Sequence, residues 1–137
     1  TYVFGEATER QRMFWQHEKN AQLAAFAAAK IGEPCGKVDD AARQYLAENG
    51  MGPEYQTPGC PHRTGHGIGL DIHEWPYLVG GNPTPLATGM CFSNEPMLVI
   101  PDEFGIRLED HFYMTDEGPR WFTEPAHSID DPFGLAK

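Results

Sequence analysis

The chain of 137 residues carries 20 acidic and 10 basic side chains, for a formal net charge of −10, and 40% of its residues are apolar. This length and composition predict one folded domain with an ordinary core and exclude a disordered tail. The acidic balance argues against a nucleic-acid partner or an anionic membrane surface, because phosphate groups are bound mainly by lysine and arginine. We expect neither a membrane span nor a signal peptide, since no segment has the required apolar length.

Three cysteines, Cys35, Cys60 and Cys91, lie far apart in the sequence. An odd number of cysteines cannot all pair within the chain, and a chain of this size does not need a disulfide framework to fold. We therefore expect free thiols and a cytoplasmic location.

The first element expected is a long helix that starts after Thr8. Thr8 and Gln11 have the spacing of a capping box, in which each side chain bonds the backbone of the other residue. The helix is predicted to run to about Ile31, where Gly32 stops it. Apolar and small residues at three- and four-residue intervals form its expected buried stripe: Met13, Phe14, His17, Ala21, Ala24, Ala25 and Ala28.

A second helix is predicted over roughly Val38 to Asn49. Its expected buried stripe consists of Val38, Ala42, Tyr45 and Leu46. Gly50 follows it, and glycine is the usual residue of a left-handed helix cap. Residues 51–64 are rich in glycine and proline and predict a loop.

Two runs rich in β-formers follow, Met90 to Ile100 and Gly105 to Met114. The residues between them form turns readily, so the runs predict an antiparallel hairpin centred near Asp102. Trp121 and Phe122 predict one further strand. The expected fold is therefore helical in its first third and made of strands and turns in the remainder.

The predicted hairpin contains two glutamates that its register places together. With the turn centred near Asp102, Glu95 and Glu109 stand opposite each other on neighbouring strands. Opposed like charges destabilise a strand pair unless something positive lies between them, and either Arg107 or a bound cation meets that need. A bulge in the second strand would instead separate the pair, and the spacing alone leaves both interpretations open.

Three of the six histidines, His62, His66 and His73, fall within twelve positions. Glycines on both sides of His66 allow its backbone to approach a ligand or another strand closely. Imidazole is a common metal ligand and a proton carrier near neutral pH, so this cluster favours a metal or proton-transfer site. Strict alternation would put His66 and His73 on opposite faces, and their convergence on one site therefore requires a bend.

Four ordered motifs resemble those of the pita-bread metallopeptidases, which include methionine aminopeptidase, Xaa-Pro aminopeptidase, prolidase and creatinase. The motifs are GHGIG at 65–69, DIHE at 71–74, SNEP at 93–96 and GIRLED at 105–110. With the opening strand-to-helix passage, the resemblance covers nearly the whole chain. It implies an α+β fold, a partial pita-bread fold with two N-terminal helices packed on an antiparallel sheet. It also implies that residues 1–137 form the C-terminal portion of a catalytic domain.

The resemblance implies a metal site. His66 and Glu95 would be ligands of one metal, and Glu109 would bridge two metals in the complete enzyme. The metal would be divalent, with Mn, Co or Zn as candidates. Such a pair of ions activates a water molecule and acts as a Lewis acid in hydrolysis.

The resemblance also implies roles around the metal. His73 would contact the substrate and steady the tetrahedral intermediate, and Arg107 would brace the ligands. His62 matches a histidine of the Xaa-Pro branch that assists proton transfer or binds substrate. The implied activity is metal-dependent hydrolysis of Xaa-Pro peptide bonds, with a proline-containing dipeptide or peptide as substrate.

One departure concerns two aspartate ligands that the family places on strands upstream of this chain. No aspartate precedes Asp39, which lies at the start of a predicted helix. We therefore expect this polypeptide alone to bind metal weakly or not at all, and to show little or no peptidase activity.

Two other functions stay open at this point. One is a creatinase-like amidinohydrolase that works without metal and relies on its histidines. The other is a non-catalytic half-domain that self-associates, because missing strands would leave an open sheet edge and an apolar patch. For the same reason we expect a homo-oligomer.

Overall fold

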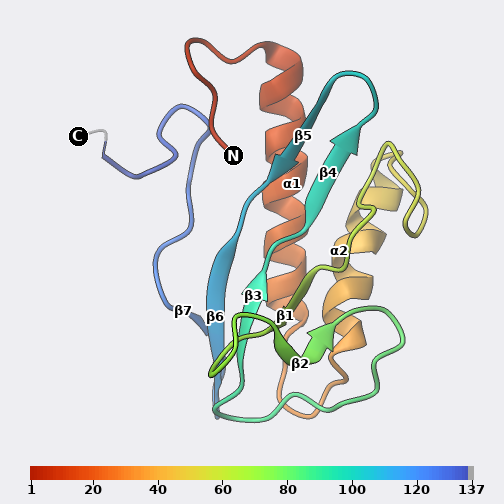
Figure 1. The fold of residues 1–137 in the computed structure, drawn as a ribbon, viewed down its shortest axis with the longest axis vertical. Helices are drawn as coiled ribbons and strands as arrows, with labels where there is room; N and C mark the ends of the chain where they lie inside the picture. The colour runs from red at the N-terminus through yellow and green to blue at the C-terminus, as the bar shows by residue number, and fades with distance from the viewer. Residues whose placement is uncertain (136–137) are drawn as a thin grey trace.

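The computed structural model describes residues 1–135 and contains two helices followed by seven strands (Figure 1). The helices are α1 (Glu9–Ala28) and α2 (Gly36–Glu48). The strands are β1 (Gly65–Gly67), β2 (Glu74–Leu78), β3 (Cys91–Asn94), β4 (Met97–Ile100), β5 (Phe104–Arg107), β6 (Asp110–Thr115) and β7 (Gly118–Trp121).

Helix α1 begins with the predicted capping box, since the Thr8 side chain accepts from the Gln11 backbone N–H and the Gln11 side chain accepts from the Thr8 N–H. It ends at Ala28, three residues before the predicted end. The predicted buried stripe is partly wrong. Met13 is 46% exposed, and polar residues of α1 are buried instead: Glu18, Lys19 and Gln22. Glu18 and Gln22 bond to backbone groups of the strand region, and such contacts do not follow apolar periodicity.

Helix α2 starts two residues earlier than predicted and ends close to the predicted position. Gly50 has a φ of 78°, the left-handed conformation expected of a cap. Val38, Ala42 and Leu46 are buried as predicted, and Asp39 is buried with them.

The strands form two antiparallel sheets. Five strands are ordered β2-β1-β3-β6-β7, and β4 pairs with β5 in a separate two-stranded sheet. Both β3–β6 and β4–β5 have the register of one hairpin centred on Asp102, as predicted. The two long predicted strands are wrong in one respect, because each is interrupted, at Glu95-Pro96 and at Leu108-Glu109. Proline lacks the N–H that a ladder needs, which explains the first interruption.

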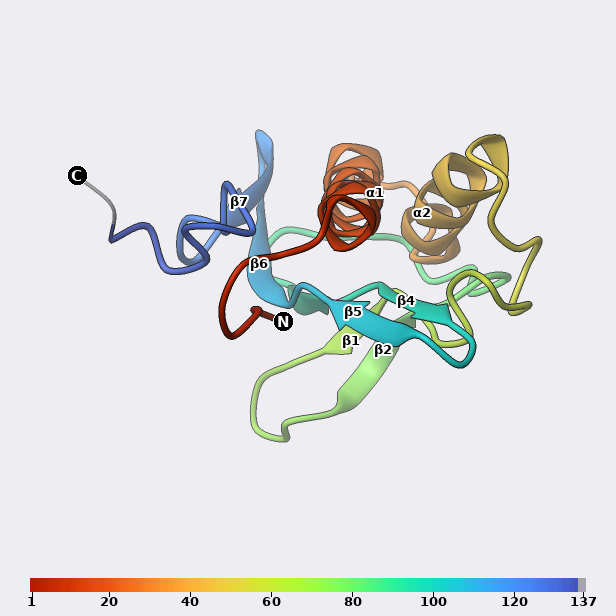
Figure 2. The ribbon, with the colours of Figure 1, turned by 90° about the horizontal axis from the view of Figure 1, so that it is seen from above.

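The helices lie in one layer, and strands β1 to β5 lie in the other (Figure 2). The core between the layers includes Trp15, Ala25, Val38, Phe92 and Leu98. The loop that joins β1 to β2 projects from the side of the sheet away from the helices (Figure 2). Over residues 1–135, neither helix is long and apolar enough to cross a membrane.

Candidate functional site

The centre of the candidate site is a buried pair of side chains, His66 on β1 and Glu95 in the gap between β3 and β4. The His66 Nε2 lies 2.8 Å from the Glu95 Oε1, and the two residues are only 3% and 5% exposed. Gly65 allows the backbones of β1 and β3 to approach closely beside the pair, because a Cβ at this position would come within 2.1 Å of the Ser93 carbonyl oxygen. The structure thus brings together two of the three metal ligands expected from the sequence.

Ser93 ties the two members of the pair to each other. Its Oγ accepts a hydrogen bond of 3.0 Å from the His66 backbone N–H and donates one of 3.1 Å to the Glu95 Oε1. The Glu95 backbone N–H in turn donates to the Thr64 carbonyl oxygen at 2.7 Å. Backbone and side-chain bonds therefore both fix Glu95 against the strand that carries His66.

Arg107, at the end of β5, lies beside one of the two glutamates, Glu95. Its Nη1 lies 3.5 Å from the Glu95 Oε2. Glu109 is exposed, and its Oε1 lies 3.8 Å from the His111 Nε2. The hairpin register places Glu109 opposite Glu95. Its carboxylate nevertheless lies closer to His111, the first residue after Asp110 on β6.

His73 joins the site because the chain reverses direction between His66 and His73. The His66 and His73 ring centroids are 4.3 Å apart, and the pairing of β1 with β2 shifts between His66 and Gly67. The chain turns back between β1 and β2, which are antiparallel, and this reversal provides the bend that convergence on one site requires. His73 is exposed, whereas His66 is buried. The site therefore has a buried ligand-type imidazole beside a solvent-facing one.

His62 is half-buried, and its Nδ1 lies 2.9 Å from the Arg63 carbonyl oxygen. Its carbonyl oxygen accepts a 2.6 Å hydrogen bond from the Arg43 Nη2. The segment that leads to His66 is thus attached to helix α2.

The sequence analysis missed the residue at the centre of that attachment, Asp39. It is fully buried, and its carboxylate accepts from Arg43 (2.7 Å), from the Thr64 N–H and hydroxyl (2.8 and 2.7 Å), and from the Gly80 N–H (2.9 Å). Buried charges persist when they are paired and fully hydrogen-bonded, and Asp39 meets both conditions. The four-residue spacing of Asp39 and Arg43 on a helix was the available signal.

Arg43 extends the same network into the loop before β1. Besides Asp39, it donates to the carbonyl oxygens of Glu54 at 2.7 Å and Cys60 at 2.9 Å. Its guanidinium also lies over the Tyr55 ring, 3.8 Å from the centroid. A single ion pair on α2 therefore organises the loop that leads to the histidine strand.

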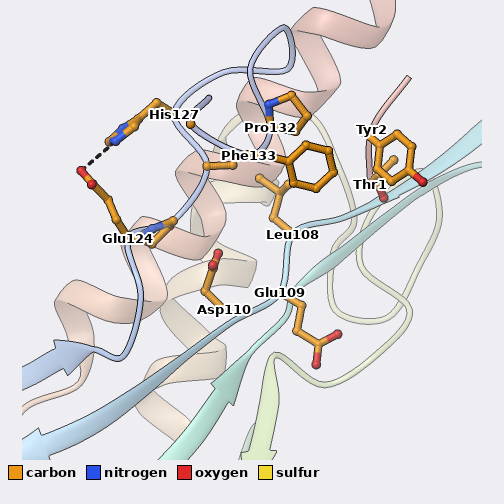
Figure 3. Close-up of a pocket in the computed structure, with 12 residues that line it drawn as sticks. Thr1, Tyr2, Leu108, Glu109, Asp110, Glu124, His127, Pro132 and Phe133 are labelled. Carbon is orange, nitrogen blue, oxygen red and sulfur yellow. Dashed lines mark hydrogen bonds and ion pairs between the residues drawn. The ribbon is translucent and has the colours of Figure 1, made fainter. Parts of the chain in front are cut away.

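A separate cavity of about 330 Å³ lies beside Glu109 and the C-terminal segment (Figure 3). Glu124 and His127, whose Oε1 and Nε2 are 2.8 Å apart, stand on one side of it, and the Glu109 carboxylate points away from them (Figure 3). His66, His73 and Glu95 do not line this cavity. We therefore place the candidate centre at the buried His66–Glu95 pair and not in this cavity.

The pair has the donor atoms that divalent transition metals take. An imidazole nitrogen and a carboxylate oxygen suit Mn, Co or Zn, and here they face each other in a buried position. Within residues 1–135, no three His, Cys, Asp or Glu side chains gather closely enough to hold a metal ion. The residues present thus fit part of a metal site.

Comparison with known proteins assigns the chain to a family. Residues 1–116 match metallopeptidase family M24. An Xaa-Pro dipeptidase from Lactobacillus delbrueckii subsp. lactis is 39% identical over 129 residues, which cover 94% of this chain and 34% of the relative. The chain spans about a third of the length of the curated relatives it matches.

Solved structures of related peptidases have a similar fold over most of this chain. The dipeptidase PepE from Mycobacterium ulcerans has a TM-score of 0.83 at 39% identity, covering 93% of this chain and 33% of that one. The X-Pro aminopeptidase from Thermotoga maritima has a TM-score of 0.84 at 30% identity, covering 93% and 35%. The fold is therefore part of the pita-bread fold, and the chain belongs to metallopeptidase family M24.

Proposed function

We propose that residues 1–137 are the C-terminal portion of the catalytic domain of a metal-dependent Xaa-Pro dipeptidase. The observation that carries the proposal is the buried pair of His66 and Glu95, with ligand-type atoms 2.8 Å apart. The relatives named Xaa-Pro dipeptidase, of which the chain covers about a third, support this substrate class. We assign the two missing aspartate ligands to sequence upstream of Thr1.

In this proposal His66 and Glu95 would hold one divalent metal, and Glu109 would help to hold both this metal and a second. Mn, Co and Zn are the candidate metals. When bound, they supply Lewis acidity and an activated water for hydrolysis. Glu109 must turn from His111 toward Glu95 to take this role, and its exposure leaves room for that rotation.

The other residues act on the substrate or on the ligands. His73, beside His66 and open to solvent, binds the substrate oxygen on which charge develops. His62 binds substrate or assists proton transfer, and Arg107 holds Glu95 in place. We also propose a cytoplasmic location and a homo-oligomeric state, which cell fractionation and light scattering test.

The first experiment compares this chain with the full-length protein that its gene encodes. We expect the upstream sequence to contain the two aspartates. The full-length protein should release proline from an Xaa-Pro dipeptide and bind Mn²⁺ tightly in calorimetry, whereas residues 1–137 alone should do neither. Tight Mn²⁺ binding or clear hydrolysis by residues 1–137 alone would contradict the expected division of the site.

The second experiment tests the assigned ligands within the full-length protein. His66→Ala should lower activity by more than the roughly 10- to 100-fold typical of residues that only support a ligand. His127→Ala is the matched control, because His127 is an exposed histidine of the C-terminal segment. Full activity after chelation would instead favour the metal-independent creatinase-like function.

A further inference from the structure

Both glutamates of the proposed metal site lie where the hairpin ladder is interrupted. On one side of the gap, Asn94 pairs with Asp110, and on the other side, Met97 pairs with Arg107. Glu95 and Glu109 lie between these pairs and outside the strands. A metal ligand on irregular backbone needs another support to keep its position, because ligands and their supporting hydrogen bonds act together.

Helix α1 provides a side chain that spans this gap. Gln22 is fully buried, and its Nε2 lies 3.3 Å from the Asn94 carbonyl oxygen and 3.4 Å from the Leu108 carbonyl oxygen. The same nitrogen donates to the Asp110 Oδ2 at 2.7 Å. One amide thus reaches both strands of the interrupted hairpin.

The two carbonyl groups belong to the peptide units that directly precede the two glutamates. The Asn94 carbonyl shares its peptide plane with the Glu95 N–H, which donates to Thr64 on its other side. The Leu108 carbonyl likewise shares a plane with the Glu109 N–H. Gln22 therefore contacts the backbone immediately before each proposed ligand.

Gln22 itself is held from several directions. The Asn94 Nδ2 donates to the Gln22 carbonyl oxygen at 2.9 Å, and the Lys19 Nζ donates to the Gln22 Oε1 at 3.2 Å. One turn earlier on the helix, the Glu18 Oε1 accepts from the Leu108 N–H at 3.3 Å. The amide is thus fixed on a regular helix and is suited to set the position of irregular backbone.

We propose that Gln22 is a positioning residue that sets the spacing of Glu95 and Glu109 for metal binding. This inference rests on the proposed function, because it assumes that both glutamates are ligands. Gln22 touches neither the metal nor the substrate. Its loss should therefore weaken metal binding and alter the coordination geometry without removing a ligand.

The test uses the full-length protein and the variant Gln22→Met, which keeps the length of the side chain and removes its donors. We expect the affinity for Mn²⁺, measured by calorimetry, to fall about 10- to 100-fold, as is typical for groups that support ligands. The visible absorption of the Co²⁺-loaded protein should change as well. Gln16→Met, at an exposed glutamine of the same helix, should change neither. A folded Gln22→Met variant with wild-type affinity and spectrum would overturn the inference.

A further variant separates this inference from the proposed function. Glu95→Gln removes a proposed ligand and should lower Mn²⁺ affinity more than Gln22→Met does. If Glu95→Gln binds Mn²⁺ as the wild type does, the proposed metal site is wrong and the inference falls with it. If Glu95→Gln loses binding while Gln22→Met keeps it, only the positioning role is wrong.

If Gln22→Met does not fold, an NMR measurement on the wild-type protein tests the positioning role of Gln22 instead. With ¹⁵N-labelled glutamine, the Gln22 side-chain amide protons should exchange slowly with solvent and shift when Zn²⁺ is added. The exposed Gln16 amide serves as the reference and should do neither. Fast exchange, or resonances that Zn²⁺ leaves unchanged, would count against the positioning role.

Discussion

The two halves of the candidate site are supported by different chemistry. The histidine side, residues 62–66, is attached to α2 through the buried ion pair of Asp39 and Arg43. The glutamate side, Glu95 and Glu109 with their flanking residues, is attached to α1 through the Gln22 amide and the Glu18 carboxyl.

This difference predicts different sensitivities. Removing one member of a buried ion pair leaves an uncompensated charge and costs about 3–5 kcal/mol, whereas an unpaired neutral group costs about 1–3 kcal/mol. Substituting Asp39 or Arg43, which support the histidine side, should therefore lower the free energy of unfolding more than substituting Gln22, which supports the glutamate side.

The largest effect should come from Asp39→Ala on the histidine side. It leaves the partly buried Arg43 guanidinium without its carboxylate and the Thr64 and Gly80 donors unpaired. We expect a loss of about 3–5 kcal/mol in the free energy of unfolding, measured by urea denaturation. Asp40→Ala, at the exposed neighbour, should change it by less than about 0.5 kcal/mol. Equal losses in the two variants would show that the ion pair has no special role.

A smaller effect of opposite sign is expected from Glu18→Gln on the glutamate side. Burial raises the pKa of Glu18 well above its ordinary value, and its Oε2 is buried without a hydrogen-bond partner in the described part of the chain. Because the folded state holds this proton more tightly than the unfolded state does, the wild type should lose stability as pH rises above about 4.5 toward the raised pKa.

Glu18→Gln cannot ionise and should remove that loss. At pH 8 we expect the variant to be more stable than the wild type, because the wild-type carboxyl must either ionise in a buried position or hold a proton that the unfolded state has lost. The difference should shrink as the pH falls to about 4.5. Urea denaturation at several pH values measures it, with the exposed Glu6→Gln as a control that should show no such trend. A difference that does not vary with pH would contradict the assignment.

The smallest effect is expected at Ser93, which is hydrogen-bonded to both the histidine side and the glutamate side. Ser93→Ala removes the hydroxyl that bonds the His66 N–H and the Glu95 carboxylate. We expect a loss of about 1–2 kcal/mol in the free energy of unfolding, because the Glu95 Oε1 keeps the His66 ring as a partner and the group left unpaired is the neutral His66 N–H. Ser128→Ala, in the C-terminal segment, is the control and should leave the His66–Glu95 pair undisturbed. A Ser93 effect as large as that of Asp39→Ala would mean that the two sides are not supported separately.

The sequence predicted those parts of the fold that depend on neighbours in the chain. The capping box of Thr8 and Gln11 and the hairpin centred on Asp102 are both local, and both are confirmed. The motifs that contain His66 and Glu95 indicated the family because the order and spacing of such motifs are distinctive.

The remaining features depend on contacts between distant residues. Gln22 is buried because it meets Asn94 and Leu108, which apolar periodicity on α1 cannot indicate. The convergence of His66 and His73 depends on the reversal of the chain between β1 and β2, which brings residues seven apart in the sequence side by side. Alternation along a single strand does not indicate such a reversal.

The shared register of β3–β6 and β4–β5 has a consequence for the order of folding. A single hairpin over residues 91–115 supplies both pairings, so it can close outward from the turn at Asp102 without waiting for a distant segment. Hairpins form in about 1–10 μs, faster than pairings that must first close a long loop. The backbone of the two glutamates can therefore reach opposite positions early, while the histidine strand, more than 20 residues upstream, joins them in a later step.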